Sequence, residues 1–344
     1  MMKFAIIGAG AIARRGHLPS LKDTRDAEVL AIVDTNENAA KKAARKFAIR
    51  NYYKNIDPVL KDEEIEAVII AIPTPTHKDV AIKAAQAGKH LIIEKPLAAS
   101  LSDGLKIKEA IEKNNVRATV VQNYRYYPSI IKARKIIRSG QLGGLTSVYG
   151  IAHTPWPNQW TRGTWLYYEP GVLLDFTPHV VDAILWISKC KPKRVFALGG
   201  DYTSHCKFIN YAQISIDFDD KTVGAIDVSW LTGMFRFVMS FIGTSGRLEI
   251  DPRYNTVFRA SGIPTPLDDI RQFMTRMKVI PDILSGRFFK VTKTLYDNFY
   301  KHLMDALQHK KRMPVPIDEA LETLAILDGA YKSIKTGNSI EVKV

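Results

Sequence analysis

The chain has 344 residues, of which 46% are hydrophobic and 24% are charged, a balance that excludes a disordered or low-complexity protein. A single hydrophobic core usually stops growing below this length, so we expect two domains. The two cysteines, Cys190 and Cys206, are too few for a disulfide framework and lack metal-ligand spacing. We therefore expect reduced thiols in a cytoplasmic protein, and no metal site.

Lysine and arginine number 49 against 35 acidic residues, which gives a net charge of +14. Such an excess permits nucleic acid, an anionic membrane or a phosphorylated substrate as partner. No nucleic-acid-binding motif accompanies the charge, and lysines spread along amphipathic helices usually form a solvated face. The apolar stretches are too short, or too interrupted by Asp175 and His179, to span a bilayer. We expect neither nucleic acid nor a membrane as partner.

The chain begins with a short apolar run at residues 3–7, followed by a G-x-G-x-x-A fingerprint at residues 8–13. Lys3 before this run resembles the start of a signal peptide, but glycines so close behind favour a buried strand and a helix to about Lys22. Glycines allow a tight turn and close approach to a pyrophosphate, whose charge the helix N-terminus stabilises. The residues expected to contact a dinucleotide here are Gly8, Gly10, Ala11 and Ile12.

A second strand is expected at residues 29–33, and Asp34 stands at its end. A carboxylate at this place accepts hydrogen bonds from the adenosine ribose hydroxyls and repels a 2′-phosphate, which favours NAD as cofactor. The nearby Lys41 and Lys42 leave NADP open. The alternative role for Asp34 is an acidic cap at the end of the strand.

Strands and helices continue to alternate, which predicts a parallel sheet and a Rossmann domain over residues 1–122. The expected strands are residues 67–71, 91–93 and 118–122, and the expected helices are residues 78–87 and 102–113. Ligands bind at the carboxyl ends of such strands, where polar segments follow at residues 73–77 and 94–96. The residues expected on the cofactor side are Pro73, Thr74, His77, Glu94 and Lys95. His77 either caps a helix or lines the cofactor.

Residues 123–344 are expected to form an α+β domain for substrate binding and oligomerisation. Alternating or apolar runs predict a mostly antiparallel open sheet. Its strands are expected at residues 194–198, 212–218, 223–231, 237–242, 248–250 and 340–344, with late helices at 295–308 and 318–335. Helices cover one face, and the bare face predicts a homodimer or homotetramer. The basic amphipathic stretch 268–294 either touches a membrane or partner, or completes the oligomer or covers the sheet.

Residues 153–169 contain Trp156, Trp160 and Trp165 together with prolines and Arg162, a composition typical of a loop. Aromatic faces pack against the C–H surface of a sugar ring while polar groups select its hydroxyls. This favours a carbohydrate or cyclitol as ligand. The alternative is an aromatic mini-core beneath a long loop.

The ordered run of residues 73–77, Ala81, 84–85, 87–90 and 94–97 resembles the Gfo/Idh/MocA family of oxidoreductases, and the match extends over essentially the whole chain. The resemblance implies an NAD(P)-dependent dehydrogenase or reductase that acts on CH–OH groups. It also implies that Lys95 is the catalytic-site lysine and that Glu94 helps to shape the nicotinamide end.

By the same resemblance, Asp175 and His179 complete the site from the second domain. The chain departs from the family pattern where Thr177 and Pro178 precede His179. It departs again where Leu166, instead of an arginine, follows Trp165. The second departure suggests Arg162 as the replacement for a substrate contact.

Hydride transfer from an alcohol needs a group that takes the hydroxyl proton and a positive group that stabilises the developing alkoxide. Lysine is protonated near neutral pH, so we expect Lys95 to donate a hydrogen bond to the alcohol oxygen. Histidine titrates near neutrality, and His179 is the expected general base in oxidation and acid in reduction.

Two local arrangements of Asp175 stay open. If Asp175 and His179 lie on one helix, their spacing of four puts both side chains on one face. If Thr177 is the N-cap and Pro178 the first helical residue, Asp175 lies before the helix. Arg125 is equally open, since it either anchors a substrate or ties the domains together.

The sequence thus predicts hydride transfer between nicotinamide and a hydroxyl-bearing carbon of a sugar, cyclitol or related small polyol. The expected substrate contacts are Lys95, Arg125, Arg162, Trp165, Asp175 and His179. One alternative is an NAD-dependent glycosidase of the same fold. Another is a non-catalytic NAD-sensing protein, suggested by the Thr177–Pro178 departure and the net charge of +14.

Overall fold

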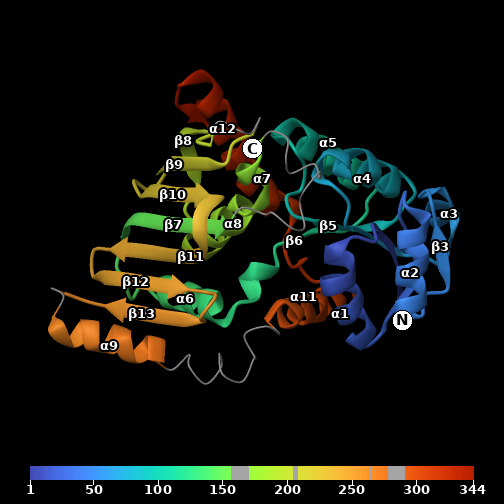
Figure 1. Ribbon diagram of the computed structural model, residues 1–344, viewed down its shortest axis with the longest axis horizontal. Coiled ribbons are helices and arrows are strands. Elements are labelled where there is room, and N and C mark those ends of the chain that lie inside the picture. The colour runs from blue at the N-terminus through green and yellow to red at the C-terminus, as the bar shows by residue number, and fades with distance from the viewer. Residues whose placement is uncertain (156–169, 204–207, 263–264, 278–290) are drawn as a thin grey trace. The chain divides into compact units, whose positions relative to one another are not determined.

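The computed structural model describes residues 1–155, 170–203, 208–262, 265–277 and 291–344. The chain divides into two compact units. Unit 1 comprises Met1–Asn123 and Phe289–Leu321, and unit 2 comprises Tyr124–Phe288 and Glu322–Val344. Figure 1 shows helices layered on a sheet in unit 1 and a broad sheet backed by helices in unit 2. Segments from the C-terminal part of the sequence therefore belong to both units.

Unit 1 is built on a six-stranded sheet whose strands are all parallel, in the order β3-β2-β1-β4-β5-β6. The strands are β1 (Met2–Ile7), β2 (Ala27–Val33), β3 (Asn51–Tyr53), β4 (Ala67–Ile70), β5 (His90–Glu94) and β6 (Ala118–Val121). Strands β4 and β6 are buried over their full length, as expected for a parallel sheet with helices on both faces. The order reverses between β1 and β4, where a Rossmann fold binds its ligand.

Two of the longer helices of unit 1 begin at side-chain caps. Asn36 accepts a hydrogen bond from the Ala39 N–H at 3.2 Å, and Ser100 accepts one from the Asp103 N–H at 3.2 Å. The helices are η1 (Ala13–His17), α1 (Leu18–Asp23), α2 (Glu37–Phe47), α3 (Asp57–Lys61), η2 (Thr74–Thr76), α4 (His77–Gln86), α5 (Leu101–Lys113) and α11 (Val291–Gln308). η1 is a single turn of π-helix, a form often found at functional sites.

Helix α11 packs within unit 1 although it comes late in the sequence. The ring of Tyr296 lies directly on the backbone of η1, since a Cβ at Gly16 would lie 2.6 Å from its Cε2 atom. Near the other end of α11, the Arg117 guanidinium donates a hydrogen bond to the Ala306 carbonyl at 2.5 Å. These contacts fix one end of α11 against η1 and the other end against the residue that precedes β6.

Unit 2 contains an eight-stranded sheet in the order β13-β12-β11-β7-β10-β9-β8-β14. Its strands are β7 (Leu145–Pro155), β8 (Pro192–Gly200), β9 (Tyr211–Phe218), β10 (Val223–Ser229), β11 (Leu231–Gly243), β12 (Gly246–Asp251), β13 (Thr256–Ala260) and β14 (Ile340–Glu341). β7 and β10 pair parallel, and the other neighbouring strands pair antiparallel. The predicted fold class, a Rossmann domain plus an α+β domain with a mostly antiparallel open sheet, is confirmed.

Helices cover one face of the unit 2 sheet. They include α6 (Pro128–Arg138), α8 (Thr177–Ser188) and α12 (Ile317–Thr336). Val180 of α8 packs on β7, where a Cβ at Gly150 would lie 2.5 Å from its Cγ2 atom. On the opposite face, apolar side chains of the described strands are exposed: Tyr149, Phe196, Leu198, Val223 and Ile242. The expected bare face is therefore present in this chain.

Several elements differ from the expected ones. The segment 153–169, expected to be a loop, begins as strand, because β7 continues to Pro155. Strands β3, β7 and β13 have no counterpart among the predicted elements. Within the stretch 268–294, helix α9 (Pro266–Met277) exposes apolar side chains at Leu267, Ile270, Phe273, Met274 and Met277. Residues 278–290 lie outside the described residues, so both alternatives for this stretch stay open.

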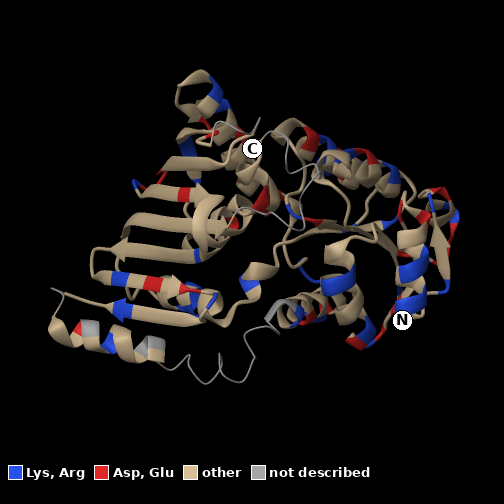
Figure 2. Cartoon of the chain, viewed as in Figure 1, with Lys and Arg blue, Asp and Glu red and all other residues tan. Residues whose placement is uncertain are grey.

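The basic residues are distributed over many elements. Figure 2 shows Lys and Arg positions interleaved with Asp and Glu on helices such as α4 and α5. Ion pairs join several of them, for example Lys78 with Asp103 at 3.1 Å and Lys108 with Asp318 at 2.6 Å. In the part of the chain that the structure describes, no helix is long and apolar enough to cross a membrane.

Candidate active site

The glycine-rich loop leaves β1 at Gly8 in a conformation that only glycine adopts comfortably, with φ of +107°. A Cβ at Gly8 would also lie 2.2 Å from the Ala71 carbonyl oxygen, so a side chain cannot fit. At Gly10 a Cβ would meet no heavy atom within 4 Å, which leaves the loop surface open for close approach of a ligand. Ala11 and Ile12 follow directly, before η1. The loop thus fits the pyrophosphate of a dinucleotide.

Asp34 lies at the carboxyl end of β2, beside this loop. Its Oδ2 atom accepts a hydrogen bond from the Ala9 N–H at 2.8 Å, and its Oδ1 atom accepts one from the Asn36 N–H at 2.8 Å. The carboxylate therefore holds the glycine loop and the turn before α2 together. A carboxylate oxygen can accept more than one hydrogen bond, so both roles expected for Asp34 are compatible with this geometry.

His77 lies in the segment that follows β4, together with Pro73 and Thr74. Its ring is fully buried, with Nε2 2.9 Å from the Ile72 carbonyl oxygen and Nδ1 3.1 Å from the Pro96 carbonyl oxygen. Burial lowers the pKa of His77, although both carbonyls favour the charged form. The ring thus joins the loop after β4 to the loop after β5. Whether the side chain also lines the cofactor stays a prediction.

Glu94 and Lys95 occupy the end of β5, at the edge of the sheet where ligands bind in this fold. Lys95 is half-buried, and its backbone N–H donates to the Oε2 atom of Glu94 at 3.1 Å. Glu94 itself is buried and accepts hydrogen bonds from His17 and Tyr296. Neither partner of Glu94 was expected from the sequence. The only local signal is that His17 closes the turn after the glycine fingerprint.

In unit 2, Asp175 and His179 belong to different helices. The short helix α7 (Val172–Asp175) ends at Asp175, and α8 begins at Thr177 with Pro178 in its first turn. Proline is tolerated there because backbone N–H groups in the first turn of a helix have no acceptor within the helix, so the missing N–H of proline costs no hydrogen bond. The arrangement with both side chains on one helix is therefore wrong, and Asp175 lies before α8. Thr177 is the first helical residue instead of the N-cap.

Aromatic side chains surround both residues. The ring of His179 is buried and stacks on Tyr124, with the centroids 3.9 Å apart and the planes 12° from parallel. Phe176 meets the same imidazole edge-on at 5.6 Å. Asp175 accepts a hydrogen bond from the Trp230 indole N–H at 3.2 Å. Tyr124 and Trp230 are neighbours of the predicted site that the sequence did not indicate.

Arg125 lies within unit 2, where it forms a two-pronged ion pair with Asp182 of α8. Its Nε atom donates to Oδ2 at 2.8 Å and a terminal nitrogen donates to Oδ1 at 2.6 Å. Both side chains are buried, and the guanidinium also lies 5.6 Å from the ring centre of Trp186. This bond anchors η3 (Asn123–Tyr126) to α8. The other expected substrate contacts, Arg162 and Trp165, lie outside the described residues, as do Trp156 and Trp160.

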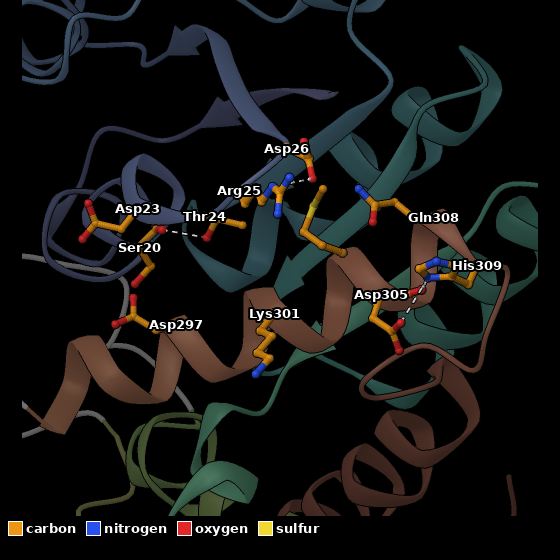
Figure 3. A pocket seen from close by; sticks show the side chains of 11 residues that line it. Ser20, Asp23, Thr24, Arg25, Asp26, Asp297, Lys301, Asp305, Gln308 and His309 are labelled. Atoms are coloured by element: carbon orange, nitrogen blue, oxygen red, sulfur yellow. Dashed lines mark hydrogen bonds and ion pairs between the residues drawn. The ribbon is translucent and has the colours of Figure 1, made fainter.

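A hollow of about 520 Å³ is present elsewhere in unit 1, between the end of α1 and helix α11. Figure 3 shows four of the residues that line it: Asp297, Lys301 and Asp305 on α11, and Arg25 in the turn after α1. Its described lining includes no residue of the predicted site. Both acidic and basic side chains line this hollow. In the part of the chain that the structure describes, no group of three metal-ligating side chains is found.

Comparison with known proteins places this architecture in a class. A model described as "Oxidoreductase family, NAD-binding Rossmann fold" matches residues 2–122, and the C-terminal domain model of the same family matches residues 130–249. The chain is therefore an NAD-binding oxidoreductase with a Rossmann unit, as the sequence predicts. It belongs to the Gfo/Idh/MocA family. The predicted family, enzyme class and cofactor are confirmed.

Relatives of this chain carry the names of sugar dehydrogenases. It is 34% identical to a levoglucosan dehydrogenase of Pseudarthrobacter phenanthrenivorans, over 44% of this chain and 40% of that protein. It is 24% identical to a D-apiose dehydrogenase of Paraburkholderia graminis, over 99% of this chain and 90% of that protein. The WlbA dehydrogenase from Bordetella pertussis, solved with NADH and UDP-GlcNAcA, superposes with a TM-score of 0.86 at 21% identity, over 100% and 98% of the two chains. At that identity the superposition shows the shared fold.

Proposed function

We propose that this enzyme transfers a hydride between nicotinamide and a hydroxyl-bearing carbon of a sugar, cyclitol or related small polyol. The observation that carries the proposal is Lys95, which directly follows a buried parallel strand at the ligand-binding edge of an NAD-binding unit. The names of relatives such as the levoglucosan and D-apiose dehydrogenases support a polyhydroxylated substrate.

The ammonium group of Lys95 carries the electrostatic part of this mechanism. Bound nicotinamide supplies the hydride acceptor or donor at the reacting carbon. Lys95 donates a hydrogen bond to the substrate oxygen and stabilises the alkoxide that develops as the C–H bond breaks. The cofactor-side residues Gly8, Gly10 and Asp34 support this role, because they belong to the same unit and the same edge of its sheet.

His179 carries the proton in this proposal, as base in oxidation and as acid in reduction. Its stacking on Tyr124 fixes the plane of the imidazole and leaves proton transfer to the ring edge. Asp175, held by the Trp230 indole, binds a neighbouring hydroxyl or orients the substrate. Arg125, Arg162 and Trp165 remain proposed substrate contacts, and residues 1–122 and 123–344 remain the proposed cofactor and substrate domains.

The bare face of the unit 2 sheet supports a homodimer or homotetramer. Exposed side chains such as Leu198 and Val223, at 57% and 56% exposure, lie on strands of the same sheet, which favours burial against a second copy. Size-exclusion chromatography with light scattering tests this directly. A stable monomer at micromolar concentration would contradict it. The cytoplasmic location and NAD rather than NADP as the preferred cofactor are further proposals.

The function is tested with a panel of sugars, sugar phosphates, cyclitols and polyols, each incubated with enzyme and NAD or NADP while NADH or NADPH absorbance is followed. We expect steady-state formation of reduced cofactor with at least one polyol. Cleavage of aryl glycosides without net NADH would instead support the glycosidase. Cofactor binding without either activity across the panel would support a sensor.

A further inference from the structure

Four buried side chains of unit 1 form a continuous hydrogen-bonded chain that ends at Glu94. Tyr300 contacts His17 Nδ1 at 2.5 Å, and His17 Nε2 lies 3.0 Å from Glu94 Oε1. Tyr296 donates its hydroxyl proton to the same Oε1 atom at 2.7 Å. The exposed fractions of Tyr300, His17, Tyr296 and Glu94 are 0%, 0%, 2% and 7%, so water cannot replace these bonds.

Every polar group of this hydrogen-bonded chain has a partner. The Nε2 atom of His17 is hydrogen-bonded to the carboxylate, and its Nδ1 atom is hydrogen-bonded to the Tyr300 hydroxyl. Burial alone would raise the pKa of Glu94, but the hydrogen bond and charge of His17, the hydrogen bond from Tyr296 and the charge of Lys95 outweigh it and lower the pKa.

The network joins three elements that are distant in sequence. His17 closes η1, directly after the glycine loop, whereas Glu94 ends β5 and Tyr296 lies on α11. Gly16 is what lets the Tyr296 ring reach its place, because a Cβ there would lie 2.6 Å from the ring. The carboxylate is thus held from both sides while its second oxygen, Oε2, accepts the Lys95 N–H.

We propose that Glu94, held by His17 and Tyr296, is a positioning residue for Lys95. It accepts the Lys95 backbone N–H through Oε2, which fixes where the Lys95 side chain leaves the backbone. Two hydrogen bonds to Oε1 prevent the carboxylate from turning away. The inference rests on the proposed role of Lys95 in hydride transfer. It assigns Glu94 no contact of its own with the substrate.

Two conservative variants test the proposal. Glu94→Gln keeps the shape of the side chain but removes the charge, and Tyr296→Phe removes the hydroxyl while its ring stays on Gly16. We expect both to lower kcat, Glu94→Gln by about tenfold to a hundredfold and Tyr296→Phe by less, because small misplacement of a reacting group is costly. KM for substrate should stay within about twofold of the wild-type value, since neither side chain is proposed to touch the substrate. The Kd for NAD is measured for each variant, so that any change in cofactor binding is separated from the change in kcat.

A second readout does not depend on turnover. In Glu94→Gln the backbone N–H of Lys95 loses its charged acceptor, so the Lys95 side chain is held less firmly. The rate at which an amine-reactive reagent modifies Lys95, measured by mass spectrometry in the absence of substrate and at constant pH, should rise severalfold as this half-buried side chain becomes more accessible. Lys89, whose Nζ donates to the Asp62 and Ile65 carbonyls, serves as the internal reference and should not change.

Tyr300→Phe is the matched control, because Tyr300 lies on the same helix but contacts His17 instead of Glu94. Its effect on kcat and on Lys95 modification should be smaller than that of Tyr296→Phe. Unchanged kcat and unchanged Lys95 reactivity in Glu94→Gln would overturn the proposal, as would a loss of activity explained entirely by weaker NAD binding. Full activity of Lys95→Ala would contradict the proposed function instead. The modification rate of Lys95, compared between the wild type and Glu94→Gln, would still test whether Glu94 positions this lysine.

Discussion

The candidate residues of the two units are held by different forces. In unit 1, Glu94 beside Lys95 accepts two hydrogen bonds from buried side chains and a third from backbone. In unit 2, the His179 ring is held by a stacked tyrosine and an edge-on phenylalanine. Hydrogen bonds to a carboxylate fix its direction and favour its charged form, whereas stacking fixes the plane of a ring.

This difference suits the two proposed tasks. A group that stabilises developing negative charge must stay protonated and point in one direction, which a buried carboxylate beside it promotes. A group that exchanges protons must present a ring nitrogen, and stacking contacts the face of the imidazole instead of the edge where the nitrogens lie. Variants on the two sides should therefore fail in different ways.

The largest effect is expected for Lys95→Ala. Loss of the ammonium removes the proposed stabilisation of the alkoxide and should lower kcat/KM by about 10²–10³-fold. NAD binding, followed by titration, should remain measurable because the glycine loop and Asp34 are untouched. Lys78→Ala, which removes a lysine of α4 paired with Asp103, is a surface control expected to keep nearly full activity. A normal rate in Lys95→Ala would remove this residue from the mechanism.

His179→Asn should lower kcat by roughly 10²-fold and change the shape of the pH–rate profile. Asparagine keeps a polar side chain on α8 but cannot exchange a proton near neutral pH. The loss should be greatest near neutrality, where histidine changes charge. The measurement is kcat/KM across the pH range in which wild type is stable. A profile with the wild-type shape would show that another group carries the proton.

Most strands of the parallel sheet can be predicted from the sequence, but one cannot. Strands β1, β2, β4, β5 and β6 were predictable, because a parallel sheet covered on both faces leaves continuous apolar runs. The glycine loop was predictable because Gly8 has a backbone conformation that other residues rarely adopt. Strand β3 escaped, since its three residues at the sheet edge are only partly buried and leave no pattern.

The side-chain contacts around the site were hidden for another reason. Glu94 is 77 residues from His17 and 202 residues from Tyr296, and no local pattern links them. The amphipathic pattern of residues 295–308 predicts a helix with one buried face but not the unit that buries it. Likewise, the stacking of Tyr124 on His179 depends on the path of the chain between η3 and α8. Only the assembled fold brings such residues together.

A smaller effect is expected for Asp34→Ala. The carboxylate is proposed to accept hydrogen bonds from the adenosine ribose, and loss of such a charged acceptor costs about 1.5–3 kcal/mol, or roughly 10–100-fold in the Kd for NAD. Because Asp34 also holds the Ala9 and Asn36 N–H groups, Asp34→Asn is the control that keeps part of this local bonding. NADP binding should weaken less than NAD binding. A greater loss for NADP would reverse the cofactor preference.

The smallest effect concerns stability and pH, through His77. Burial lowers the pKa of His77, so between its folded value and its unfolded value of about 6.5 the unfolded chain binds the additional proton. The contribution of His77 to stability therefore falls as pH drops below about 6.5. His90 and His302 share this direction because burial lowers the pKa of each.

We thus expect the Tm of the wild type to fall between about pH 8 and about pH 5.5, and to fall less steeply in His77→Gln. The variant should be less stable at every pH, since it loses a ring that joins two loops, but the readout is the slope. Glu94 does not interfere in this range. Its lowered pKa removes stability only as pH falls below the unfolded value of about 4.5. Identical slopes in the two proteins would mean that the His77 imidazole accepts its proton equally well in the folded chain.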